Sequence, residues 1–299
     1  MITVKEILEG IDFIKFVGNE EQHISKVIKL DASNIHQDTI CWCNDKNLHN
    51  LKKTYKGTVI CSNKVLDFLH DGIKCNLIIV DNPRFIFASI LSKHFAPKIK
   101  QHEISLRAFV DSNSKIGKNV FIGDFTVIEK GVVIGDNTYI GYNNTVLEKT
   151  VIGNNVKIGS NNTIGGVGFG YEMNEEGKHV LIPHIGNVEI KNNVEIGNNN
   201  CIDKAVLGST IISENVKIDN LVHIAHGVKI GKNSFIISNS MIAGSSSIGE
   251  NVWIAPSSSI INNCNIGDNA VVGIGSVVLN AVEKKEVVVG VPAKPLVRK

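Results

Sequence analysis

Residues 228–260 read VKIGKNSFIISNSMIAGSSSIGENVWIAPSSSI, in which an isoleucine stands at every sixth position. The same step of six extends well beyond this stretch in both directions. Aliphatic residues occupy every sixth position from Ile116 to Ile164, from Ile190 to Ile202 and from Ile212 to Val278. An α-helix would show a period of 3.6 and a plain strand a period of 2, so neither explains the spacing. A repeat of six predicts a solenoid in which each hexad supplies one short strand and one corner.

The geometry of such a solenoid follows from the hexads. Three hexads close one triangular coil of about 18 residues, and the repeated Ile or Val stacks inside the prism on its counterpart one coil earlier. Glycine, asparagine and aspartate follow the aliphatic residue, as in Ile134-Gly135 and Gly153-Asn154-Asn155. These residues tolerate left-handed backbone, which tight corners require. We therefore expect a mainly β fold, a parallel β-helix.

The hexad is interrupted twice. Ile190 stands 26 positions after Ile164, and Ile212 stands ten positions after Ile202, and neither step is a multiple of six. A solenoid accepts insertions as surface loops, often on its binding face. Residues 165–189 are thus predicted to form an insertion loop.

The chain divides into four parts. Residues 1–97 lack the hexad, and they alternate short apolar runs (58–60 and 77–80) with a helical stretch at 85–94, as in a small α/β domain. Residues 98–107 are predicted to be a linker, 108–289 the solenoid and 290–299 a C-terminal cap, since the prolines there cannot continue a ladder.

Composition excludes several classes of function. Apolar residues make up 43%, and 31 basic against 29 acidic residues leave a net charge of +2, which favours neither nucleic acid nor an anionic membrane as a partner. No apolar run reaches membrane-spanning length and the start lacks a signal-peptide core, so a cytoplasmic protein is expected. The six cysteines lack zinc or redox spacing, so reduced thiols and no metal are expected.

Transfer of an acyl group to an amine needs a base and donors for the oxyanion. The solenoid contains four histidines: His179, His184, His223 and His226. His226 stands two residues after inward-pointing Ile224, so it belongs to a corner, and the position one coil later is Gly244. A glycine there leaves room for substrate and exposes a backbone N–H, so we predict His226 as general base and the Gly244 N–H as oxyanion donor. The alternative is that His226 is a solvated corner residue.

Several segments resemble the UDP-3-O-(3-hydroxyacyl)glucosamine N-acyltransferase family of lipid A biosynthesis. They are residues 168–171 (GFGY), 182–188 (IPHIGNV), 194–197 (VEIG), 202–204 (IDK), 217–226 (KIDNLVHIAH) and 82–95. The resemblance implies a left-handed β-helix, a homotrimer and His226 as the general base. The residues expected to bind substrate are Phe169, Tyr171, His184, Asp203, Asn220, His223 and Trp42.

The chain also departs from the family pattern. The family usually has Gln where this chain has His184 and His223, Arg where it has Lys204, and Asn where it has Gly227. Trp42 is one residue out of register with the family's uracil-stacking aromatics, so it either stacks on a base or lies in the core. The family's C-terminal helices, associated with trimer contacts and acyl carrier protein, do not follow the final Gly-Val-Pro-Ala-Lys-Pro run. Lys294 and Arg298 are therefore predicted to meet the phosphates of CoA.

Three hypotheses remain open at this point. The first is an N-acyltransferase that transfers an acetyl or short acyl group from acetyl-CoA or another acyl-CoA to a UDP- or dTDP-linked amino-deoxy sugar for a surface glycan. The second is the lipid A enzyme itself, with a 3-hydroxyacyl chain on acyl carrier protein as donor. The third is a non-catalytic solenoid scaffold. The sequence leaves open the sugar, the amine position and the acyl length.

Overall fold

The computed structural model describes residues 1–30, 36–51, 56–68, 74–97 and 103–296. The chain forms two compact units, Met1–Ile99 and Lys100–Lys299. Within the described residues, no helix combines the length and the apolar character needed to cross a membrane. The described cysteines are all free thiols.

The N-terminal unit is a small α/β domain built on a five-stranded sheet. Its strand order is β2 (Lys15–Val17), β7 (Asn76–Ile79), β6 (Thr58–Cys61), β5 (Thr39–Trp42) and β4 (Lys26–Val27). A two-stranded ribbon pairs β1 (Ile2–Thr3) with β3 (His23–Ile24). The helical segments are α1 (Val4–Leu8), η1 (Asp45–Asn50), η2 (Asn63–Phe68), α2 (Pro83–Ile90) and the π-helical turn η3 (Leu91–Phe95).

Local sequence explains the central strands and the start of α2. β6 and β7 pair in parallel at the centre of the sheet and are buried along their whole length, which matches their mostly apolar sequences. α2 begins where Asn82 caps it, because its side-chain oxygen accepts the N–H of Phe85 at 3.1 Å and Pro83 occupies the first turn.

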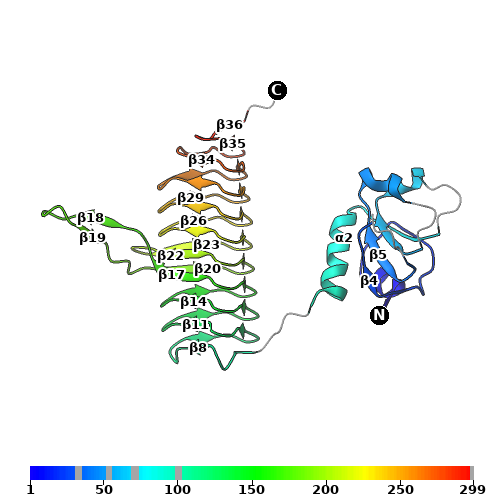
Figure 1. Cartoon of the computed structure of the whole chain (residues 1–299), viewed down its shortest axis with the longest axis horizontal. Helices are drawn as coiled ribbons and strands as arrows, with labels where there is room; N and C mark the ends of the chain where they lie inside the picture. The colour runs from blue at the N-terminus through cyan, green and yellow to red at the C-terminus, as the bar shows by residue number, and fades with distance from the viewer. Residues whose placement is uncertain (31–35, 52–55, 69–73, 98–102, 297–299) are drawn as a thin grey trace. The chain divides into compact units, whose positions relative to one another are not determined.

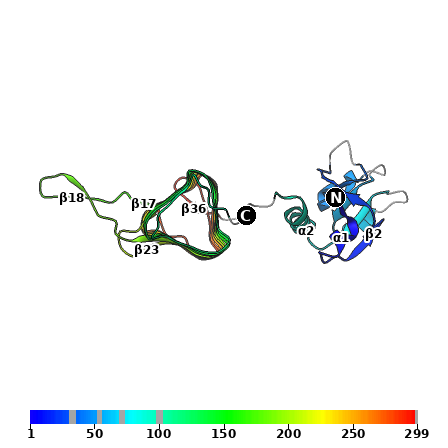
Figure 2. The same ribbon diagram turned by 90° about the horizontal axis from the view of Figure 1, so that it is seen from below.

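The second unit is a left-handed parallel β-helix of triangular cross-section (Figures 1 and 2). Face 1 contains β10 (Phe121–Ile122), β13 (Tyr139–Ile140), β16 (Lys157–Ile158), β21 (Glu195–Ile196), β24 (Lys217–Ile218), β27 (Phe235–Ile236), β30 (Trp253–Ile254), β33 (Val271–Val272), β35 (Val287–Val289) and β36 (Lys294–Pro295). Face 2 contains β8 (Phe109–Val110), β11 (Val127–Ile128), β14 (Thr145–Val146), β17 (Thr163–Val167), β22 (Cys201–Lys204), β25 (His223–Ile224), β28 (Met241–Ile242), β31 (Ser259–Ile260) and β34 (Val277–Val278). Face 3 contains β9 (Lys115–Ile116), β12 (Val133–Ile134), β15 (Val151–Ile152), β20 (Asn187–Ile190), β23 (Ser209–Ile212), β26 (Lys229–Ile230), β29 (Ser247–Ile248) and β32 (Asn265–Ile266). The predicted mainly β class and the predicted β-helix are confirmed.

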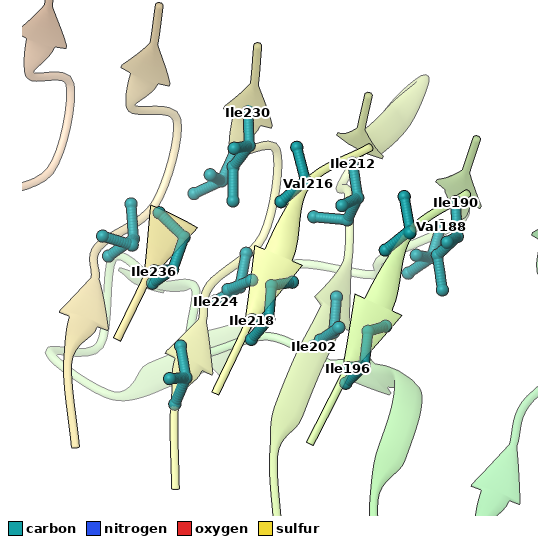
Figure 3. Packing of buried hydrophobic residues seen from close by; sticks show 14 of the residues in the cluster. Val188, Ile190, Ile196, Ile202, Ile212, Val216, Ile218, Ile224, Ile230 and Ile236 are labelled. Carbon is teal, nitrogen blue, oxygen red and sulfur yellow. The ribbon is translucent and has the colours of Figure 1, made fainter. Parts of the chain in front are cut away.

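The hexad residues form the core of the prism. On face 1, Ile122 pairs with Ile140 and Ile140 with Ile158, each step 18 residues long. All three side chains are fully buried, and Figure 3 shows the same stacking around Ile218 and Ile224. Each coil contributes only one or two buried aliphatic residues per face, so the core is continuous only because the coils stack.

The corners use left-handed backbone, mostly at asparagine. Asn119 and Asn137 have φ of 60° and 56°, and similar values recur at the same corner in later coils. The amide of Asn119 donates to the side-chain oxygen of Asn137 at 2.9 Å, which ties neighbouring coils together. Asparagine therefore provides both the corner conformation and a link between coils.

Both interruptions of the hexad emerge at the corner between faces 2 and 3. The first forms the antiparallel hairpin of β18 (Tyr171–Met173) and β19 (His179–Leu181), which projects from the solenoid (Figure 1). The second lies between β22 and β23. The coil resumes in register after each interruption, with Ile152 paired to Ile190 and Ile190 to Ile212.

At each end of the solenoid, the flanking chain pairs with the terminal coil through its backbone. Residues 103–107 of the predicted linker join the first coil, where Ile104 bridges to Ile122. Residues 98–102 lie outside the described residues. At the other end, the predicted cap turns back, so that β36 pairs antiparallel with β35.

The two residues of β16 provide a matched test of the stacking. Ile158 is fully buried inside the prism, whereas Lys157 points outward. Ile158→Ala should lower the free energy of unfolding by about 2–5 kcal/mol, because a buried cavity replaces the side chain. Lys157→Ala should stay within about 0.5 kcal/mol of the parent. Urea unfolding followed by circular dichroism measures both, and equal losses would contradict the inward stacking.

Candidate active site

The predicted base and the predicted oxyanion donor, His226 and Gly244, both lie at the corner between faces 2 and 3. β25 ends at Ile224 on face 2, β26 begins at Lys229 on face 3, and His226 lies in the corner between them. One coil later the same corner contains Gly244. The stacking of the coils thus places His226 and Gly244 in one column.

A cavity of about 340 Å³ opens at this column. Its lining consists of Phe169, Asp203, His223, Ala225, His226, Met241, Ala243, Gly244, Ser245, Asn262 and Asn263. Polar side chains from the regular coils and the aromatic side chain of Phe169 from the insertion therefore line the same cavity.

The imidazole of His226 lies between two glycines. A Cβ atom on Gly244 would stand 2.7 Å from both Cε1 and Nε2 of His226. A Cβ atom on Gly168, from the insertion, would stand 2.8 Å from the Cβ and 2.9 Å from the Cδ2 of His226. Real Cβ atoms do not approach this closely, so both positions need glycine. The Nε2 end of the ring faces Gly244.

The surroundings of His226 favour its neutral form. Burial lowers the pKa of His226 below its ordinary value, and the neighbouring His184 lowers it further, while the Asp203 carboxylate opposes the shift. A neutral imidazole has one bare nitrogen that accepts a proton. His226 is therefore suited to the role of general base near neutral pH.

His223 has the opposite character. Its Nε2 lies 3.0 Å from Oδ2 of Asp203, a buried residue on the neighbouring strand β22. The hydrogen bond to Asp203 raises the pKa of His223, with burial opposing and the charge of Asp203 adding to the rise. Two histidines with oppositely shifted pKa values thus share one cavity, which is typical of acid–base sites.

Thr210 connects the second interruption to the same corner. Its hydroxyl donates to the carbonyl of Asp203 at 2.7 Å and accepts the N–H of Gly227 at 2.8 Å. Gly227 follows His226 directly and has a φ of +70°. The buried hydroxyl of Thr210 therefore fixes the backbone on both sides of the cavity.

The predicted oxyanion donor is available for a ligand. The carbonyl of Gly244 accepts the N–H of Asn263 at 2.9 Å. The N–H of Gly244 has no hydrogen-bond partner among the described residues, and Gly244 lines the cavity. The geometry is compatible with the predicted role.

The other predicted residues do not all come together. Phe169 lines the cavity and is 86% exposed, whereas Tyr171 lies on β18 with its ring 5.0 Å from that of Phe169. Asn220 is outside the cavity lining, and its side-chain oxygen accepts the backbone N–H of Asn198 at 2.7 Å. Asn220 is thus used by the corner ladder of the solenoid.

Lys294, one of the two predicted CoA-binding residues, does not line the cavity of His226. Lys294 lies on β36, near the C-terminal end of the solenoid, and lines a different cavity of about 240 Å³. Arg298 lies outside the described residues. Within the residues that the structure describes, no three His, Cys, Asp or Glu side chains are grouped to hold a metal ion.

Trp42 belongs to a cavity within the N-terminal unit. It stands at the end of β5, is partly buried, and packs against the core that includes Phe87. A cavity of about 440 Å³ is lined by Val27, Ile28, Lys29, Leu30, Trp42, Asn44, Asn47 and Phe87. Trp42 therefore both packs against the core and lines this cavity.

Several residues of the site were missed by the sequence analysis, among them Gly168, Thr210 and Met241. Gly168 contacts the base, Thr210 fixes the corner, and Met241 lines the cavity beside His223, its partner on the neighbouring strand. The position of Met241 follows from the hexad, because it stands 18 residues after His223. Gly168 and Thr210 lie at the interruptions, where no period indicates their neighbours.

The comparisons with known proteins agree with this architecture. A family model described as bacterial transferase hexapeptide (six repeats) matches residues 113–148, 209–244 and 245–280. A solved UDP-N-acetylglucosamine acyltransferase from Francisella novicida has a TM-score of 0.60 and 27% identity, covering 65% of this chain and 70% of its own. The corresponding structure from Bacteroides fragilis has a TM-score of 0.59 and 26% identity, covering 65% and 74%.

Relatives with higher identity carry one common name. A UDP-3-O-acylglucosamine N-acyltransferase from Campylobacter lari is 41% identical over 250 residues, which cover 79% of this chain and 77% of the relative. One from Helicobacter hepaticus is 42% identical over 212 residues, covering 68% of this chain and 64% of the relative.

The fold and the histidine cavity define a hexapeptide-repeat acyltransferase. The chain belongs to the UDP-3-O-acylglucosamine N-acyltransferase family. The resemblance found in its sequence is thereby confirmed, as is the prediction that it is an enzyme.

The lowered pKa of His226 predicts the pH dependence of acyl transfer. The neutral base exists above its pKa, so kcat/KM should stay level at neutral pH and fall only below the ordinary histidine value of about 6.5. Asp203→Asn removes the carboxylate that opposes the shift and should move this fall to still lower pH. A pH–rate profile of parent and variant measures both. A fall that begins above the ordinary value would contradict the assignment.

The contact between Gly244 and His226 predicts a steric block. Gly244→Ala places a methyl group against Cε1 and Nε2 of His226 and should lower kcat by roughly 10²-fold, the cost of misplacing a catalytic group by about 1 Å. Gly208→Ala is a control at the same corner, since a Cβ there meets nothing within 4 Å, although its φ of +72° adds backbone strain. Steady-state kinetics, with melting curves for folding, compare the two. Equal activities would remove Gly244 from the site.

Proposed function

We propose that this protein transfers an acyl group from a thioester to the amine of a UDP-linked 3-O-acylglucosamine. The observation that carries the proposal is the cavity in which His226, whose pKa is lowered by burial, faces Gly244, whose N–H has no hydrogen-bond partner within the described part of the chain. The names of its relatives supply the substrate class, since they act as UDP-3-O-acylglucosamine N-acyltransferases.

The proposed chemistry uses His226 and Gly244 in turn. The amine nitrogen attacks the thioester carbonyl carbon, and Nε2 of His226 takes the proton that the nitrogen loses. The carbonyl oxygen becomes an oxyanion, which accepts the N–H of Gly244. The intermediate collapses to an amide, the carbon–sulfur bond breaks, and the thiolate leaves. The protonated His226 returns its proton to that thiolate.

The donor follows the second of the hypotheses drawn from the sequence. The first, a short acyl group from CoA for a surface glycan, rested on the end of the chain and on the shift at Trp42. The relatives' names support the lipid A hypothesis instead. Lys294, one of the two residues expected to meet CoA, lines a different cavity from that of His226. We therefore propose a 3-hydroxyacyl group on acyl carrier protein as donor.

The N-terminal unit is proposed to bind the nucleotide. Its cavity offers the indole of Trp42 for stacking and the side-chain amides of Asn44 and Asn47 for hydrogen bonds. Binding of a uracil base needs both ring stacking and hydrogen bonds. The domain boundary near residues 98–107 fits a separate nucleotide-binding module.

The assembly is proposed to be a homotrimer. The hairpin of β18 and β19 leaves Met173, Val180 and Leu181 exposed, and an isolated hairpin is only marginally stable in water. Neighbouring copies would cover this apolar surface, and light scattering measures the state directly. The cytoplasmic location expected from the sequence stays a prediction.

A donor and acceptor assay tests the proposed function. The enzyme should convert UDP-3-O-acylglucosamine with 3-hydroxyacyl carrier protein, and kcat/KM should rise with chain length because each buried methylene contributes about 0.8 kcal/mol. His226→Ala should lower turnover by roughly 10²–10⁴-fold while the fold is kept, which identifies the activity with this site. A higher kcat/KM with acetyl-CoA than with every carrier-protein thioester would favour the first hypothesis over this one.

A further inference from the structure

His184 is a buried histidine at the base of the insertion, beside the proposed general base. Only 6% of its surface is exposed. Its Nδ1 lies 2.7 Å from the carbonyl oxygen of Ile182, and a carbonyl only accepts, so Nδ1 carries the proton. Its Nε2 is buried and has no hydrogen-bond partner among the described residues. The ring of His184 is thus anchored at one edge by the Ile182 carbonyl, while the nitrogen at its other edge makes no hydrogen bond to the described residues.

The orientation of His226 does not come from a hydrogen bond. Neither of its ring nitrogens has a partner among the described residues, in contrast to catalytic triads, where a carboxylate orients the base. The ring is held by packing: Gly244 meets one end and Gly168 the other. The imidazole of His184 lies edge-to-face against that of His226, with ring centroids 5.2 Å apart and planes at 79°.

The backbone of the insertion joins the two rings. The Cβ position of Gly168 is 2.9 Å from Nε2 of His184 and 2.9 Å from Cδ2 of His226. Gly168 therefore has no room for a side chain, because both imidazoles already occupy its surroundings. The loop, the anchored ring and the base form one packed unit.

We propose that His184 is a positioning residue for His226: anchored on the Ile182 carbonyl, its ring holds the base in the orientation that faces Gly244. This inference rests on the proposed role of His226 as the base. It replaces the expectation that His184 binds substrate, because His184 is buried and lies outside the cavity lining.

Electrostatics support the packing argument. The titratable groups around His226 are His184 on the insertion side and Asp203 and His223 on the cavity side. Among the causes of the lowered pKa of His226, His184 comes second after burial, whereas Asp203 acts in the opposite direction. The residue that orients the base thus also favours its neutral form.

The test uses three variants of the full chain. His184→Ala removes the ring, and His184→Gln restores a side chain that reaches the Ile182 carbonyl with an amide N–H. His179→Gln is the matched control, because His179 lies on β19 of the same insertion and is exposed. Each variant is measured for kcat and KM, and the titration of His226 is followed by imidazole NMR. The His226 resonance is assigned by its loss in His226→Gln.

The expected pattern separates positioning from substrate binding. His184→Ala should lower kcat by about 10–100-fold with KM nearly unchanged, since a displaced base loses turnover rather than affinity. His184→Gln should recover most of that loss. The pKa of His226 should rise in both, and His179→Gln should match the parent in every measurement.

Two results would overturn the inference. A higher KM at unchanged kcat in His184→Ala would make His184 a substrate ligand. A His226 titration identical to the parent in that variant would show that the two rings are not coupled. Because the NMR titration needs no substrate, a protein that is inactive with every donor but shows the shift would refute the proposed function and leave the coupling intact.

Discussion

The stacking of equivalent residues 18 positions apart is the constraint on which the rest of the solenoid depends. Ile140 stacks on Ile158, and Ile158 on Ile196 across the long insertion, so the register is recovered after 20 additional residues. A slip of one residue would turn every inward side chain outward. Departures from the repeat are therefore confined to corners, where extra chain leaves the prism without disturbing the stack.

The same register produces the active site. Corner residues of successive coils lie in a column as the isoleucines do, so a histidine at position 226 has position 244 as its neighbour. A glycine at 244 makes that neighbour a space with a backbone N–H beside it. Both interruptions leave the prism at this corner, and the longer one places Gly168 and His184 against the other side of the base. The stacked coils thus place Gly244 beside His226, and the insertion packs against the opposite side of His226.

The hexad explains why much of the fold and part of the site were predictable. Period and phase give the stacked coils and the pairing of His226 with Gly244, because both depend only on counting. The resemblance gave Asn220 as a substrate-binding residue, and counting alone shows neither that role nor the one in the structure, where its side-chain oxygen accepts the N–H of Asn198 in the preceding coil.

Other features have no periodic signal. The contacts of Gly168, His184 and Thr210 depend on how aperiodic chain folds back on the corner. The interior contains a further departure, since Asn144 and Asn162 are buried among aliphatic residues. Each side-chain oxygen accepts the backbone N–H one coil later, at 2.9 Å from Asn162 and 2.8 Å from Asn200, which offsets the cost of burying an amide.

The opposite behaviour of the two cavity histidines follows from their spacing. They stand three positions apart, so His223 projects outward from face 2, beside the buried carboxylate of Asp203, while His226 turns into the corner between glycines. The carboxylate stabilises the proton on His223 and raises its pKa; burial and His184 lower that of His226. Close to neutral pH, His226 is therefore suited to accept the amine proton, whereas the neighbouring His223 retains its own proton more strongly. The two histidines differ in this way because each outward position of the β-helix has its own neighbours in the coils before and after it.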